Sequence, residues 1–242
     1  MEAPRVKICG LVRTEDARAA GEAGADYAGA VLVPGGPRAV SPERAAELGR
    51  ASGRPLVAVM ADLEPAEAEA RAQVAGASIL QLHGDEAPSQ VADLRRRGPW
   101  RVWKSLRVRR ASEALERARS YAGVVDGILL DSWHPARAGG TGRRFEWEAV
   151  DELRALLVAR GADLVVAGGL SAENVEEAVR RLRPGVVDVS SGVEGGPGRK
   201  DPERIRAFVV AARGGGGVGM ETRADGEGET GNEPSGRPGG VR

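Results

Sequence analysis

The sequence has little of what many secreted, metal-binding or membrane proteins depend on. One cysteine in 242 residues cannot form an internal disulfide. Two histidines and no Cys-x-x-Cys pair leave no ligand set typical of structural zinc, so no metal is expected. No apolar run is long enough for a signal peptide or a membrane-spanning helix. We therefore expect a cytoplasmic protein with a reduced thiol and no membrane partner.

Net charge and nucleotide-binding motifs are missing as well. The 35 Lys and Arg residues balance the 35 Asp and Glu residues, which gives no electrostatic attraction towards nucleic acid. Neither a glycine-rich dinucleotide fingerprint nor a P-loop is present, so no cofactor is expected. Aromatic residues make up only 3% of the chain, and the core must therefore consist mainly of Val, Leu, Ile and Ala.

Short β-branched runs alternate with Ala-, Glu- and Arg-rich stretches along most of the chain. Strands are expected at Val6–Cys9, Tyr27–Val33, Leu56–Met60, Ile79–Leu82, Arg101–Leu106, Gly127–Leu130, Asp163–Ala167 and Val186–Ser190. Helices are expected near Thr14–Ala23, Pro42–Ala51, Pro65–Ala75, Pro88–Arg97, Glu113–Tyr121, Glu148–Arg160, Ala172–Leu182 and Pro202–Ala212. Strands that are apolar on nearly every residue are typical of parallel sheets covered by helices.

Eight strand–helix units in about 210 residues predict an α/β fold, a single (β/α)8 TIM barrel over residues 1–213. The alternative is a doubly wound open sheet, which would carry its glycine-rich ligand loop early in the chain. Here the glycine-rich loops follow the seventh and eighth strands, which favours the barrel.

Local signals mark the helix starts and the end of the domain. Ser41 and Asp201 each precede a proline and are expected to be N-caps, as is Ser171 in the segment SAEN. Residues 214–242 are rich in glycine and poor in apolar residues, so they cannot bury enough surface to offset the entropy of ordering. We expect them to form a disordered tail outside the barrel.

In a barrel of this type, the loops that follow the strands form the active site. The polar residues at or just beyond the carboxyl ends of the predicted strands are Cys9, Arg38, Gln81, His83, Asp85, Lys104 and Asp131. Cys9 and Asp131 end strands that face each other across the barrel mouth, with the Arg38 cation at the rim. A thiol, a carboxyl group and a fixed cation in one cavity suit proton-transfer chemistry.

The loops after the seventh and eighth strands predict a phosphate site. Glycines that expose backbone N–H groups beside serine hydroxyls and a helix N-terminus can bind an anion, and these loops commonly bind phosphate in this fold. The candidate residues are Gly168, Gly169, Ser190, Ser191 and Gly192. A small phosphorylated molecule, a sugar in particular, is therefore the expected partner.

Each candidate has a structural alternative that the residues alone leave open. A lone cysteine is more often a buried, inert hydrophobic side chain than a reactive thiol. Asp131 could cap the turn that follows its strand, and His83 could be a core histidine with satisfied hydrogen bonds. Arg38 is equally compatible with an exposed surface, because arginine is abundant throughout the chain.

A set of motifs follows one another in the order and spacing of a known family. They are VKICG, GADYAGAVLVPGGPRAVSPE, LQLHGDE, ILLDS, GGTGRRFEW, AGGLSAENVEEAV and VDVSSGVEGGPGRKDPERI, and they extend from about Arg5 to Arg213. The chain resembles phosphoribosylanthranilate isomerase, a (β/α)8 enzyme of tryptophan biosynthesis. The sequence departs from the usual family pattern at Ala30, Leu32, Met60 and Asp62, which puts the shape of the pocket in question.

The resemblance implies a cofactor-independent Amadori rearrangement of N-(5-phosphoribosyl)anthranilate to 1-(2-carboxyphenylamino)-1-deoxyribulose 5-phosphate. It implies that Asp131 is the general acid and that Cys9 is the general base. An acid at this position needs a pKa raised by burial, whereas neighbouring cations or oriented backbone dipoles can lower the pKa of the thiol, and the sequence leaves the ionisation state of Cys9 open. It places Arg38 on the anthranilate carboxylate and Asp188 beside the sugar. Gln81 and His83 are further expected substrate contacts.

Other readings of the same residues are a different phosphosugar isomerase or epimerase, or a non-catalytic barrel that binds a phosphosugar. The first would need a metal-binding histidine set or a diphosphate site, which the sequence lacks. The second would be favoured if Cys9 or Asp131 were missing, and both are present. The protein is expected to be a monomer or a homodimer, as members of this family are.

Overall fold

The computed structural model describes residues 2–107, 111–131 and 147–214. Eight parallel strands form a closed barrel in chain order, and β1 pairs with both β2 and β8. The strands are β1 (Arg5–Ile8), β2 (Tyr27–Val31), β3 (Leu56–Met60), β4 (Ile79–Leu82), β5 (Arg101–Arg107), β6 (Gly127–Asp131), β7 (Asp163–Ala167) and β8 (Val186–Val189). The predicted (β/α)8 barrel is confirmed.

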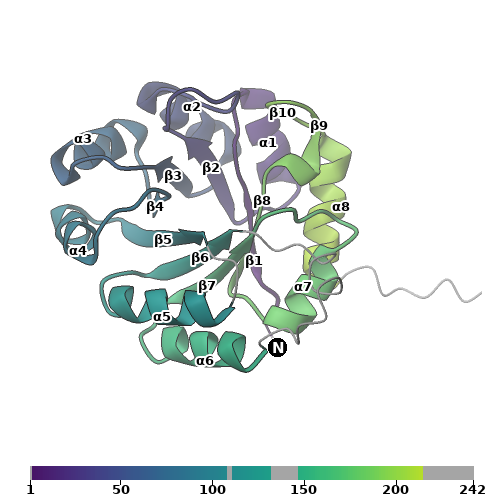
Figure 1. Cartoon of the computed structure of the whole chain (residues 1–242). Coiled ribbons are helices and arrows are strands. Elements are labelled where there is room, and N and C mark those ends of the chain that lie inside the picture. The colour runs from purple at the N-terminus through teal and green to yellow at the C-terminus, as the bar shows by residue number, and fades with distance from the viewer. Residues whose placement is uncertain (1, 108–110, 132–146, 215–242) are drawn as a thin grey trace, which may run out of the picture.

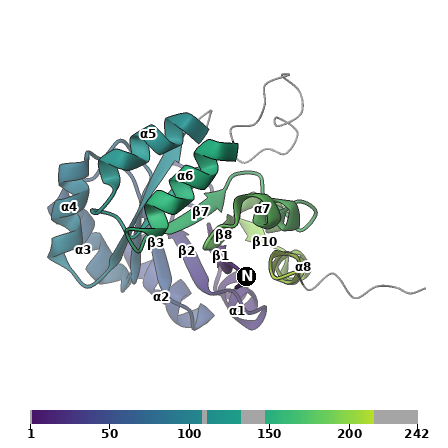
Figure 2. The same cartoon turned by 90° about the horizontal axis from the view of Figure 1, so that it is seen from below.

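A helix follows each strand of the barrel, and the helices surround the strands in Figure 1. They are α1 (Thr14–Glu22), α2 (Pro42–Ser52), α3 (Pro65–Ala75), α4 (Pro88–Arg97), α5 (Ala111–Tyr121), α6 (Trp147–Val158), α7 (Val175–Leu182) and α8 (Pro202–Ala212). The last helix, α8, packs between α7 and α1 and so completes the ring, which Figure 2 shows from another side.

The helix caps follow the sequence signals at two of the three expected positions. The Ser41 hydroxyl accepts a hydrogen bond from the backbone N–H of Arg44, and the Asp201 carboxylate caps α8. The prediction for Ser171 is wrong, because α7 begins four residues later, after Asn174. The Asn174 side chain accepts a hydrogen bond from the backbone N–H of Ser171, which holds the intervening residues in a turn.

The segment between β8 and α8 is more structured than the sequence indicated. A short 3-10 helix (Ser191–Val193) leads into a hairpin of β9 (Glu194–Gly196) and β10 (Arg199–Lys200). The expected tail, residues 214–242, lies outside the described residues apart from Gly214. Among the residues that the structure describes, no helix is long and apolar enough to cross a membrane.

The buried apolar residues form two clusters, because successive side chains of each strand point to opposite faces of the barrel sheet. The larger cluster lies between the barrel and the helices, and a smaller one fills the barrel interior. Within the smaller cluster, the rings of Trp103 and Tyr27 meet edge to face, with centroids 5.5 Å apart. These side chains close the barrel below the carboxyl ends of the strands, where the polar residues lie.

Candidate active site

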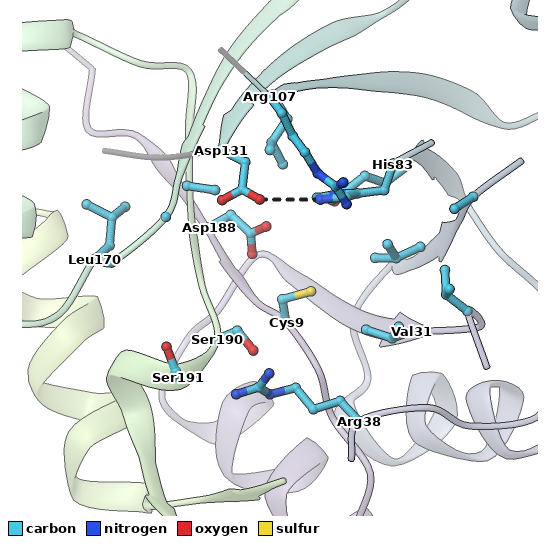
Figure 3. Close-up of a pocket in the computed structure, with 18 residues that line it drawn as sticks. Cys9, Val31, Arg38, His83, Arg107, Asp131, Leu170, Asp188, Ser190 and Ser191 are labelled. Atoms are coloured by element: carbon cyan, nitrogen blue, oxygen red, sulfur yellow. Dashed lines mark hydrogen bonds and ion pairs between the residues drawn. The ribbon is translucent and has the colours of Figure 1, made fainter. Parts of the chain in front are cut away.

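A cavity of about 480 Å³ opens at the carboxyl ends of the strands (Figure 3). Its lining residues come from both ends of the chain and from every strand of the barrel or the loop after it. They are Cys9, Val31, Val33, Arg38, Val59, Ala61, Gln81, His83, Arg107, Leu129, Asp131, Ala167, Gly168, Gly169, Leu170, Asp188, Ser190 and Ser191. Of the residues predicted to be catalytic or to bind substrate or phosphate, all but Gly192 therefore lie around one cavity; the further strand-end candidates Asp85 and Lys104 do not line it.

Cys9 lies just beyond the end of β1, and its thiol points into the middle of the cavity (Figure 3). Its backbone N–H donates to the carbonyl of Val189 in β8 at 2.8 Å, which fixes the position of the side chain. Burial raises the pKa of the thiol, and the nearby Lys7 ammonium opposes this rise only in part. The neighbouring cations therefore act to lower the pKa of Cys9, but burial outweighs them.

Lys7 is a fully buried ammonium group on the same face of β1 as Cys9. Its Nζ donates to Asp188 Oδ2 at 2.8 Å and to Gln81 Oε1 at 2.7 Å. A Cβ atom on Gly29 of β2 would lie 2.9 Å from Lys7 Cε and 3.1 Å from the Cys9 sulfur, so this glycine leaves the room that both side chains need. Sequence reasoning missed Lys7, although a lysine inside an otherwise apolar strand signals a buried ion pair.

Asp188 has one carboxylate oxygen that is still available to a ligand. Its Oδ2 accepts from Lys7, but the buried Oδ1 has no hydrogen-bond partner among the described residues. An unpaired buried acceptor is costly, and one that lines a cavity is a natural contact for a hydroxyl group of a bound molecule.

Asp131 ends β6 and faces His83 from the loop after β4, with 3.3 Å between Asp131 Oδ2 and His83 Nε2 (Figure 3). The hydrogen bond from His83 lowers the pKa of Asp131, and burial opposes this only in part. The nearby positive charge of Arg107 acts in the same direction as His83. Burial acts to raise this pKa, as expected, but the net shift is downward because of these partners, which the prediction did not include.

Arg38 reaches the cavity from the loop after β2 and is fixed by Glu194 of β9. The guanidinium Nε and Nη2 donate to the two Glu194 carboxylate oxygens at 2.7 and 2.8 Å, a bidentate pair. Lys200 of β10 donates to the same carboxylate at 3.0 Å and to the Ser190 carbonyl, also at 3.0 Å. Burial opposes ionisation of Glu194, but the hydrogen bonds from Arg38 and Lys200 prevail and hold its pKa at about 2.

We expect Glu194→Gln to lower the free energy of unfolding by about 3 kcal/mol at neutral pH. The pKa of Glu194 is depressed in the folded state, so its stabilisation is present above the unfolded value of 4.5 and is lost as the pH falls towards about 2. Urea unfolding at several pH values measures this. The difference between the two proteins should shrink below about pH 4.

The matched control for this experiment is Glu203→Gln, which removes an exposed carboxylate from the first turn of α8. Exposed ion pairs contribute little, so this change should cost less than about 1 kcal/mol. Equal effects of the two substitutions would contradict the conclusion that the ion pairs of Glu194 with Arg38 and Lys200 stabilise the fold.

The loops after β7 and β8 form one wall of the cavity. Gly168, Gly169, Ser190 and Ser191 line it, and the two glycines have φ values of +86° and +69°. Gly192 lies behind this wall, where a Cβ atom would come within 1.9 Å of the Leu170 carbonyl oxygen. The glycine thus allows the two loops to pack together, and its expected contact with phosphate stays a prediction.

Several residues that the sequence analysis singled out lie outside the cavity. Lys104 is buried on the face of β5 opposite to Trp103, which points into the barrel. Its Nζ lies 3.2 Å from Glu86 Oε2, and the residue does not line the cavity. The departures from the family pattern at Ala30, Leu32 and Met60 are core residues, and they do not line the cavity either. Within the described ranges, no group of three or more His, Cys, Asp or Glu side chains could hold a metal ion.

The geometry can be compared with proteins of known activity. Residues 6–211 match the family model described as N-(5'-phosphoribosyl)anthranilate isomerase. The chain belongs to this family. The phosphoribosylanthranilate isomerase of Pelobacter propionicus is 43% identical over 216 residues, which cover 86% of this chain and 95% of the relative. That of Bradyrhizobium is 44% identical over 213 residues, covering 86% of this chain and 94% of the relative.

Solved structures of phosphoribosylanthranilate isomerases have the same fold. The Thermotoga maritima enzyme superposes with a TM-score of 0.74 at 37% identity, covering 87% of this chain and 99% of that one. Another structure of an isomerase of this family, in complex with reduced 1-(o-carboxyphenylamino)-1-deoxyribulose 5-phosphate, superposes with a TM-score of 0.73 at 35% identity and the same coverage. The predicted family and isomerase function are therefore confirmed.

Proposed function

We propose that the chain performs the phosphoribosylanthranilate isomerase reaction with Asp131 as the general acid and Cys9 as the general base. The observation that carries this assignment is that the single thiol of the chain and the Asp131 carboxyl group line the same cavity. The cavity also holds a guanidinium group and a wall of two glycine- and serine-containing loops. These groups match an anionic, phosphorylated substrate whose rearrangement needs proton transfers and no redox step.

The first step opens the ribose ring. Asp131 donates a proton to the ring oxygen as the bond between this oxygen and C1′ breaks. The lone pair of the anthranilate nitrogen forms a C=N bond to C1′, which gives a protonated Schiff base. Asp131 becomes a carboxylate in this step, and the hydrogen bond from His83 stabilises the negative charge.

The second step moves a proton away from C2′. The Cys9 thiolate takes this proton, and the electron pair of the C–H bond forms a C1′=C2′ double bond while the C=N electrons return to nitrogen. The resulting enolamine gains a proton at C1′ and loses one from the C2′ hydroxyl, which yields the ketone. Two protons are taken up and two are released, so the sequence balances without an oxidant.

The remaining cavity residues suit the groups that do not react. We propose that Gly168, Gly169, Ser190 and Ser191 bind the phosphate and that Asp188 Oδ1 accepts a hydrogen bond from a sugar hydroxyl. Arg38 would hold the anthranilate carboxylate through its Nη1 side, because Glu194 occupies Nε and Nη2. The Gln81 and His83 contacts to substrate, the cytoplasmic location and the monomer-or-homodimer state stay predictions.

The test of this function is turnover of N-(5-phosphoribosyl)anthranilate, followed by the loss of its anthranilate fluorescence. A non-catalytic barrel would bind the phosphosugar without changing the signal. The related aminoaldose of histidine biosynthesis, which undergoes the same Amadori chemistry, should be assayed in parallel. Turnover of that substrate alone would contradict the assignment of Arg38 to a carboxylate on an aromatic ring.

We expect kcat/KM to be nearly independent of pH between about pH 7 and pH 8. The active form needs a protonated Asp131 and an ionised Cys9, whose pKa values are lowered and raised, respectively. As the pH rises between these two pKa values, the protonated fraction of Asp131 falls tenfold per unit and the thiolate fraction of Cys9 rises tenfold. The product of the two fractions stays constant. A tenfold slope in this interval would contradict the assignment.

A further inference from the structure

A hydrogen-bonded chain connects the barrel interior to Asp131. Lys7 Nζ lies 2.7 Å from Gln81 Oε1, and Gln81 Nε2 lies 3.3 Å from His83 Nδ1. The other ring nitrogen, His83 Nε2, lies 3.3 Å from Asp131 Oδ2. Lys7 and Gln81 are both buried, so water does not compete for the first links of this chain.

The two ends of this chain fix the direction of every hydrogen bond within it. A lysine ammonium can only donate, so the Gln81 oxygen must face Lys7 and the Gln81 NH₂ group must face His83. His83 Nδ1 must then accept, which leaves the proton of the neutral ring on Nε2. An Nε2–H group donates to the Asp131 carboxylate, which can only accept.

The other tautomer of the neutral His83 ring would place a donor against a donor at Gln81 and an acceptor against an acceptor at Asp131. A proton on His83 Nδ1 would face the Gln81 NH₂ group, and the Nε2 lone pair would face the Asp131 carboxylate. Turning the Gln81 amide over would relieve the first conflict but would direct its NH₂ group at the Lys7 ammonium. Lys7 and Gln81 are buried, so an unmatched polar group on either of them is costly, and this favours the arrangement with the proton on His83 Nε2.

We infer that Lys7 and Gln81 are positioning residues that hold His83 in its Nε2–H tautomer, so that His83 donates to Asp131. This rests on the proposed function, in which Asp131 is the acid that becomes a carboxylate as the ring opens. The donor is oriented before the charge forms, and the stabilisation therefore needs no rearrangement at the moment of reaction. Gln81 and His83 act on the reaction through Asp131, in addition to any contact that they make with substrate.

Nitrogen NMR of the ligand-free protein tests this inference, because a protonated and an unprotonated ring nitrogen give distinct signals. The chain has only two histidines, and His134→Gln assigns the signals of His83. Spectra recorded over a series of pH values identify the neutral ring directly, because only one of its two nitrogens then carries a proton. We expect a protonated Nε2 and an unprotonated Nδ1. A proton on Nδ1 in the unmodified ring would overturn the inference without any further variant.

Gln81→Glu is the decisive substitution, because it replaces the NH₂ donor by a carboxylate oxygen of the same size. We expect His83 Nδ1 to become protonated and kcat to fall about 10- to 100-fold, with a smaller change in KM. Gln81→Met removes the donor without adding an acceptor, and it should give a mixture of tautomers. An unchanged His83 spectrum in Gln81→Glu would overturn the inference.

The spectra need no turnover, so they separate this inference from the proposed function. An inactive protein with the expected tautomer would support this inference and contradict only the proposed function.

Discussion

Cys9→Ser is expected to lower kcat/KM by about 10²- to 10⁴-fold. The serine hydroxyl fits the space of the thiol, but it is far too weak an acid to be ionised near neutral pH, so it cannot serve as a base. Phosphate, sugar and carboxylate contacts would remain, so the loss should appear in kcat more than in KM. Steady-state kinetics with the fluorescence assay measures both constants. A variant that retains a third or more of the original kcat would contradict the role of Cys9.

The thiol itself provides an independent measurement. Cys9 is the only cysteine, so the rate of alkylation of the whole protein reports on this residue alone. Because burial raises its pKa, alkylation should be slow at neutral pH and should accelerate above the ordinary thiol value. A reduced product analogue should protect the thiol, since Cys9 lies in the middle of the cavity. Alkylation at the same rate with and without the analogue would contradict this placement.

Asp131→Asn is expected to cause a loss of similar size, about 10²- to 10⁴-fold in kcat. The amide has the shape of the carboxyl group, and its oxygen can still accept from His83, but it cannot donate a proton as an acid does. The charge that His83 and Arg107 stabilise would also be absent. Binding of the product analogue should change much less, which isothermal calorimetry can measure alongside the kinetics.

Asp85→Asn is the matched control, since Asp85 is exposed on the loop after β4 and does not line the cavity. The same chemical change there should leave kcat within about twofold. Because the acid and the base act in one reaction sequence, the double variant Cys9→Ser/Asp131→Asn should lose much less than the product of the single losses. Equal activity of Asp131→Asn and the control would contradict the assignment.

The fold could be predicted closely because local signals and the overall architecture agree. β3, β4 and β7, and α3, α4 and α8, begin and end at the predicted residues. The prediction failed where a side chain satisfied the backbone in an unforeseen way, as Asn174 does before α7. The rule that barrel sites lie at the carboxyl ends of strands was sufficient to bring Cys9, Arg38 and Asp131 to one cavity.

The electrostatics of the site could not be predicted in the same way, because it depends on pairs that are distant in sequence. Lys7 and Asp188 are 181 positions apart, and Arg38 and Glu194 are 156 apart. The net pKa shift of Asp131 is opposite to the one expected from burial, and at Cys9, whose ionisation the sequence left open, burial outweighs the neighbouring cations. His83 decides the sign of the pKa shift of Asp131. The sequence predicted that His83 lies on the loop after β4, but it did not show that the ring faces Asp131.

The pairing of β1 with β8 has a consequence for the order in which the protein becomes active during its synthesis. Cys9 leaves the ribosome before Asp188 and Ser190, which complete its surroundings and follow roughly 180 residues later. At typical translation rates this delay is on the order of ten to forty seconds. Throughout that time the nascent chain carries its thiol without the strand that fixes it. Catalytic competence therefore requires that β8 has been made and has paired with β1, which closes the barrel.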